Sequence, residues 1–136
     1  MNEYPFTSLV TLGLVILGGL LANRVSNARL DFSQSDQPSV TQHSVEIYSD
    51  PKFMIAFRNQ MNLLEHLILF MPTLWIFAVG VSDGIAAIVG LGYFIGRVLY
   101  ARSYPHSHKF GYTLTMISML LLITGAVASS IYQLVT

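Results

Sequence analysis

Three polar residues share one stripe of a segment that is otherwise apolar. In FRNQMNLLEH, residues 57–66, Arg58, Asn62 and Glu65 follow one another at intervals of four and three positions. A helix places side chains with this spacing on the same face. A guanidinium binds a carboxylate through two parallel hydrogen bonds, and an amide beside it fixes the ligand's orientation. The segment therefore has the side chains for holding a small, charged organic ligand.

A second stripe of the same kind occurs in GRVLYARSY, residues 96–104. It consists of Arg97, Tyr100 and Tyr104. If the two stripes face one another, two arginines meet one acid, Glu65, and the excess positive charge predicts an anion site. The alternative is an internal ion pair between Arg58 and Glu65, with Arg97 extending to the membrane surface.

The stretches around these stripes are long enough and apolar enough to span a membrane. Charged residues make up 10% of the 136 residues and hydrophobic residues 53%, whereas roughly a quarter of an ordinary soluble domain is charged. About twenty apolar residues in a helix cross a bilayer. The sequence predicts one domain, residues 1–136, in the all-α class: an integral membrane four-helix bundle with helices near residues 5–23, 53–80, 85–103 and 110–133.

The basic residues predict the orientation of this bundle. All seven lie in or beside the loops at residues 24–52 and 103–110. Because cytoplasmic loops carry an excess of lysine and arginine, these two loops are expected in the cytoplasm and both termini on the other side.

Ionisable groups within membrane spans face a bundle interior or a water-filled cavity and mark functional sites.

The two stripes resemble the motifs of the MAPEG family, the membrane-associated proteins in eicosanoid and glutathione metabolism. RNQMNLLEH is similar to the family's Arg-x-Gln-x-Asn-x-x-Glu pattern on the second helix, and the Arg97, Tyr100, Tyr104 spacing is similar to its third-helix pattern. The resemblance implies a homotrimer in the lipid bilayer that binds glutathione between neighbouring subunits near the cytoplasmic face. Glutathione is then a co-substrate, and no metal is implied.

The resemblance also implies which residues hold glutathione. Position by position, the expected glutathione-binding residues are Arg24 or Arg29, Arg58, Gln60, Asn62, Glu65, Arg97, Tyr104, His108 and Tyr112. Catalytic relatives place an arginine just before the fourth helix, where this chain reads SHKFGY. Lys109 is therefore the first candidate for stabilising the glutathione thiolate, and Tyr100 is the second.

Two functions follow from the resemblance. The first is a membrane-bound glutathione transferase or peroxidase that acts on lipophilic electrophiles or lipid hydroperoxides arriving from the bilayer. The alternative is a non-catalytic lipid-binding or scaffold protein of the same fold, which the missing arginine favours.

Composition excludes other classes of function. Seven basic and seven acidic residues cancel, which argues against nucleic acid as a partner. The pair of histidines in HSH, residues 106–108, lacks the further ligands that a metal site needs. A channel would need polar residues along a whole helix, and the fourth apolar stretch has only scattered Ser and Thr.

Overall fold

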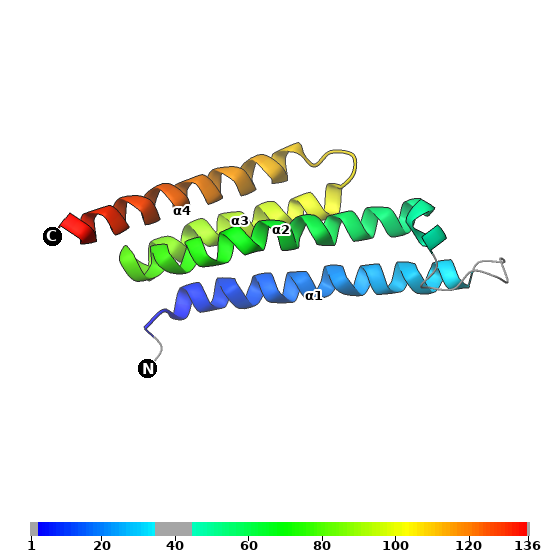
Figure 1. The fold of residues 1–136 in the computed structure, drawn as a ribbon, viewed down its shortest axis with the longest axis horizontal. Coiled ribbons are helices and arrows are strands. Elements are labelled where there is room, and N and C mark those ends of the chain that lie inside the picture. The colour runs from blue at the N-terminus through cyan, green and yellow to red at the C-terminus, as the bar shows by residue number, and fades with distance from the viewer. Residues whose placement is uncertain (1–2, 35–44, 136) are drawn as a thin grey trace.

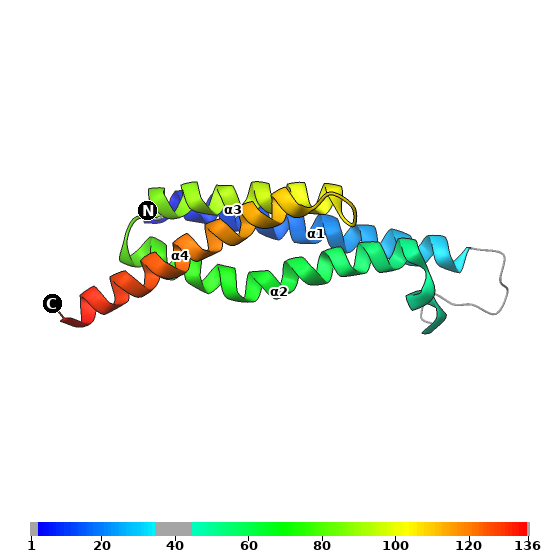
Figure 2. The same ribbon diagram turned by 90° about the horizontal axis from the view of Figure 1, so that it is seen from above.

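Four long helices lie side by side in the computed structural model, which describes residues 3–34 and 45–135. In chain order they are α1 (Pro5–Ser33), the short 3-10 helix η1 (Val45–Ser49), α2 (Pro51–Gly80), α3 (Asp83–Ser103) and α4 (Lys109–Val135). The chain runs up and down, so both termini lie at one end and the α1–α2 and α3–α4 connections at the other (Figure 1). In Figure 2, α4 crosses α3 at a clear angle. The prediction of an all-α, four-helix fold is confirmed.

The outward faces of the helices are apolar. All four helices are long enough and apolar enough to cross a membrane. Large side chains such as Leu9, Ile68, Ile88 and Leu120 are exposed on the single chain. Burying each in hydrocarbon is favourable by about 1.5–3 kcal/mol, so a bilayer is the medium that these surfaces fit.

Helix α1 is longer than the sequence predicted. The apolar stretch ends near residue 23, but the helix continues to Ser33. Val25, Ala28 and Phe32 keep the helical spacing past that point and pack with Ile47 and Phe53. Residues 24–33 are therefore helix rather than loop. The first charged residues after the apolar stretch mark where the chain leaves the hydrocarbon layer, and the helix continues past that point. The part of the expected loop at residues 35–44 lies outside the described residues.

Side-chain caps fix where the other helices begin. Asp50 accepts a hydrogen bond from the Phe53 amide at 2.8 Å, and Ser82 accepts one from the Ile85 amide at 3.5 Å. Asp83 reaches across the bundle to the first turn of α1, where its carboxylate accepts bonds from the Phe6 and Thr7 amides at 3.1 and 2.8 Å. A carboxylate at a helix N-terminus satisfies free amides and complements the helix dipole. Asp83 thus ties α1 to α3 at the terminal end.

Glycines bring α3 and α4 into backbone contact beside the second polar stripe. A Cβ added at Gly111 would lie 2.5 Å from the Tyr100 nitrogen and 2.7 Å from the Gly96 carbonyl oxygen. No side chain fits at that distance, so glycine sets how closely α4 approaches Tyr100. Small residues serve this purpose in membrane helix packing.

Gly111→Ala is expected to push α4 away from α3. The free energy of unfolding should fall by about 1–3 kcal/mol, as for other overpacked contacts. Gly18→Ala is the matched control, because a Cβ there meets nothing within 4 Å. Thermal unfolding of both variants in detergent measures the difference, and equal stabilities would contradict the proposed contact.

Candidate functional site

A pocket of about 240 Å³ lies between α2 and α3, toward the end of the bundle that carries the long connections. Its lining residues come from both polar stripes: Arg58, Met61, Asn62, Glu65, Tyr100 and Tyr104. Apart from Met61, each was singled out from the sequence. The structure therefore brings the two stripes together around one hollow.

A buried arginine contacts two of the residues that line this pocket. Arg97 is 2% exposed and donates a hydrogen bond from Nη1 to Asn62 Oδ1 at 2.9 Å. Its Cζ atom lies 5.1 Å from the centroid of the Tyr100 ring, a cation–π distance. The alternative prediction that Arg97 extends to the membrane surface is wrong. Arg97 instead holds Asn62 and Tyr100, which line the pocket.

Arg58 and Glu65 are both exposed at the pocket. Seven helical positions separate them by about 10 Å along the axis of α2, and no ion pair joins them in the described part of the chain. The internal pair proposed from the sequence is therefore absent, and both charges face the pocket. One cation and one anion at opposite ends of a hollow suit a ligand that carries both charges.

An aromatic wall closes the side of the pocket formed by α3. The rings of Tyr100 and Tyr104 stack with centroids 5.5 Å apart. His108 sets its ring edge against Tyr100 at 5.3 Å, and its Nδ1–H donates to the Pro105 carbonyl oxygen at 3.2 Å. His108 thus supports the two tyrosines from the α3–α4 connection without lining the pocket itself.

Asn59 is a supporting residue that the sequence reasoning missed. It is 4% exposed, and its Nδ2 donates to the Ala101 carbonyl oxygen at 3.0 Å. This bond joins α2 to α3 one turn from the Arg97–Asn62 bond. The sequence contains a signal for this role. An asparagine inside an apolar span needs a hydrogen-bond partner, and Asn59 lies three positions, about one helical turn, before Asn62.

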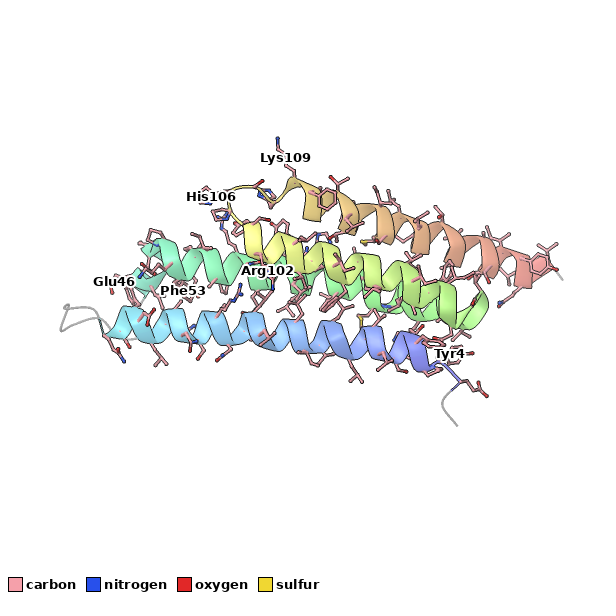
Figure 3. The ribbon with its side chains drawn as sticks, turned by 180° about the vertical axis from the view of Figure 1, so that it is seen from behind. Tyr4, Glu46, Phe53, Arg102, His106 and Lys109 are labelled. Atoms are coloured by element: carbon pink, nitrogen blue, oxygen red, sulfur yellow. The ribbon has the colours of Figure 1, made fainter. Side chains whose placement is uncertain are left out.

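The other residues predicted for the site lie outside the pocket of this chain. Gln60 is half-buried on α2, and Tyr112 is exposed on α4. Arg29 packs its guanidinium over the Phe53 ring at 5.5 Å. Arg24 lines a different groove, between α1 and α3. Lys109 is exposed, and its side chain points away from the bundle (Figure 3).

A hollow of about 520 Å³ between α1 and α3 has an apolar lining without a charged group. The pocket between α2 and α3 has the side chains for chemistry. Residues 3–34 and 45–135 contain no group of three or more His, Asp or Glu side chains that could hold a metal ion.

Comparison with known proteins identifies the family. The MAPEG family model matches residues 7–130. The chain belongs to the MAPEG family. An uncharacterized protein of Synechocystis is 39% identical over 136 residues, covering 98% of this chain and 93% of that protein.

Animal enzymes of the MAPEG family are also similar to this chain. Mouse leukotriene C4 synthase is 32% identical over 112 residues, covering 82% of this chain and 69% of the enzyme. The rat enzyme is 33% identical over 106 residues, covering 78% of this chain and 65% of the enzyme. Membership in the family and four apolar helices make this MAPEG protein an integral, multi-pass membrane protein.

Asn62→Leu is expected to destabilise the protein, because it removes the acceptor that binds the buried Arg97 guanidinium. The expected loss is about 1–3 kcal/mol in the free energy of unfolding. In an Arg97→Met background the same change should cost much less, since the cation that needs Asn62 is gone. Thermal unfolding of the double-mutant cycle measures this coupling, and effects that add to within about 0.5 kcal/mol would contradict it.

Proposed function

We propose that this protein is a membrane-bound glutathione transferase or peroxidase that acts on lipophilic electrophiles or lipid hydroperoxides. The observation that carries the proposal is the pocket between α2 and α3, where Arg58, Asn62, Glu65, Tyr100 and Tyr104 meet. These residues come from the two motifs that resemble the family's glutathione-binding patterns. The leukotriene C4 synthases among its relatives agree with an enzyme of this class.

The charges of the pocket complement those of glutathione, which carries two carboxylates and one ammonium group. Arg58 is positioned for a carboxylate and Glu65 for the ammonium. Asn62 and the tyrosine hydroxyls are suited to the peptide groups between them. Arg97 contributes indirectly, because its hydrogen bond to Asn62 Oδ1, at 2.9 Å, holds the Asn62 side chain in place. In this proposal Arg97 is a positioning residue, and Arg58 is the anion-binding one.

We propose that a neighbouring subunit completes the site in a homotrimer. The pocket of one chain, about 240 Å³, is smaller than the roughly 300–1,000 Å³ of most ligand sites, and it opens on the outer surface of the chain. Charged groups at this depth need shielding from lipid. Arg29 and Gln60 lie outside the pocket of their own chain and are candidates to reach the site of the next. Native mass spectrometry tests the assembly, and a stable monomer with full glutathione affinity would contradict it.

Catalysis requires the glutathione thiolate. A free thiol has a pKa of about 8.5, and lowering it by two units requires about 2.7 kcal/mol of preferential interaction with the anion. Lys109 points away from the bundle in this chain (Figure 3), whereas Tyr100 lines the pocket beside the Arg97 guanidinium. We therefore assign stabilisation of the thiolate to the Tyr100 hydroxyl, which donates a hydrogen bond to the sulfur.

The apolar co-substrate arrives from the bilayer. In the transferase reaction the thiolate sulfur forms a bond to the electrophilic carbon as the bond from that carbon to its leaving group breaks. The leaving group takes the electron pair of the broken bond and then a proton. In the peroxidase reaction two glutathione molecules become one disulfide while the hydroperoxide becomes an alcohol and water. Both reactions use the same bound thiolate.

A non-catalytic lipid-binding or scaffold role is the second candidate. The specific observation that favours it is the direction of Lys109, which leaves the pocket of this chain without the cation expected before α4. A protein with that role would bind its partners without forming a thiolate.

We also propose that the long connections face the cytoplasm. Arg102 and Lys109, which flank the α3–α4 connection, lie toward the end opposite Tyr4 (Figure 3), which follows the positive-inside rule. Glutathione then enters from the cytoplasm. A reporter fused to the C-terminus should report the opposite side, and a cytoplasmic signal would contradict the orientation.

Arg58→Ala is expected to weaken glutathione binding about tenfold to hundredfold, because a hydrogen bond to a charged group contributes about 1.5–3 kcal/mol. Lys52→Ala is the matched control, since it removes an exposed cation from the first turn of α2 outside the pocket. Calorimetric titration of both variants in detergent measures the difference. Equal affinities would contradict the role of Arg58.

Tyr100→Phe is expected to raise the pKa of the bound thiol while keeping the ring that stacks on Tyr104. Thiolate absorbance, followed against pH, should then appear at higher pH than in the unaltered protein. Lys109→Ala should leave this curve unchanged. If Lys109→Ala moves it and Tyr100→Phe does not, the assignment to Tyr100 is wrong. If the unaltered protein forms no thiolate near neutral pH, the scaffold role replaces catalysis.

A further inference from the structure

A long groove runs between α1 and α3 on the single chain, and it ends at two arginines. Its first part, about 520 Å³, begins at Phe6 and Gly84 near the terminal end. Its second part, about 180 Å³, ends at Arg24 and Arg102 near the long connections. Both parts are lined by Gly13 and Phe94, so they form one continuous surface. In Figure 3, Arg102 lies between the ribbons of α3 and α1.

The two ends of this groove differ in chemistry. Side chains of the first part are hydrocarbon throughout, from Phe6 and Leu9 on α1 to Ile88 and Leu91 on α3. In the bilayer, the medium that fits such a surface is an acyl chain. At the other end both arginines are exposed, and no acidic side chain pairs with either within the described residues. Their charges are therefore free to meet an anion.

We propose that this groove binds an anionic glycerophospholipid, with an acyl chain along Gly13 and Phe94 and the phosphate between Arg24 and Arg102. Guanidinium groups bind phosphate oxygens bidentately, and basic pockets between membrane helices bind anionic headgroups. Arg24 lies where the uncharged stretch of α1 ends, which is the depth at which a lipid phosphate sits. A zwitterionic headgroup fits less well, because its ammonium would lie near two guanidinium groups.

This site is separate from the pocket between α2 and α3. Neither arginine lines that pocket, and the proposal does not depend on glutathione binding. The proposal also assigns a role to Arg24, which does not line the pocket between α2 and α3. Of the two arginines considered for glutathione from the sequence, Arg29 remains the candidate.

Native mass spectrometry in detergent tests the proposal, with phosphatidylglycerol and phosphatidylcholine of identical acyl chains as probes. The unaltered protein should retain phosphatidylglycerol preferentially. A basic residue near a lipid headgroup contributes about a fivefold preference, so Arg24→Ala and Arg102→Ala should each lower the preference about fivefold. Lys52→Ala, which removes an exposed cation outside the groove, should leave it unchanged.

A second variant tests the apolar part of the groove. A Cβ at Gly13 meets Phe94 at 3.5 Å, an ordinary contact, so Gly13→Leu extends into the groove from a position that accepts a side chain. It should reduce retention of both lipids. The proposal is overturned if the unaltered protein retains both lipids equally, if Lys52→Ala acts like the arginine variants, or if loss of the arginines dissociates the assembly instead of releasing lipid.

Discussion

The site between α2 and α3 depends on a guanidinium buried in an apolar bundle. Removing a charge from water costs several kcal/mol unless polar groups replace the water. Arg97, at 2% exposure, donates a hydrogen bond to the side-chain Oδ1 of Asn62 and lies over the face of Tyr100. These two partners belong to α2 and α3, so solvating one cation fixes how the helices face one another. Asn62 and Tyr100 both line the pocket, and the other polar residues of its lining each lie one helical turn from one of these two.

Other contacts fix how α1, α2 and α4 pack against α3. Asn59 bonds to the Ala101 carbonyl oxygen on the α2–α3 interface. Gly96 and Gly111 let α4 pack against the backbone of Tyr100. At the terminal end, the Asp83 carboxylate holds the first turn of α1. Each contact joins backbone to a short side chain or to backbone, so each brings its two helices close together.

The sequence predicted the spans and the two polar stripes because both follow from spacing. Apolar stretches of about twenty residues determine helices in a bilayer, and polar residues at intervals of three and four must share a face. The extension of α1 to Ser33 was missed because it depends on contacts with Ile47 and Phe53. The direction of Lys109 and the separation of Arg24 from the pocket were also missed. Each depends on how helices rotate against one another, which spacing within one helix does not determine.

The most direct measurement is an experimental structure of the detergent-solubilised protein with bound glutathione. The account predicts glutathione in the pocket between α2 and α3, with a carboxylate at Arg58 and the sulfur within hydrogen-bond reach of the Tyr100 hydroxyl. Arg97 should remain bonded to Asn62. Glutathione bound elsewhere, or a pocket that stays empty at saturating glutathione, would contradict the account.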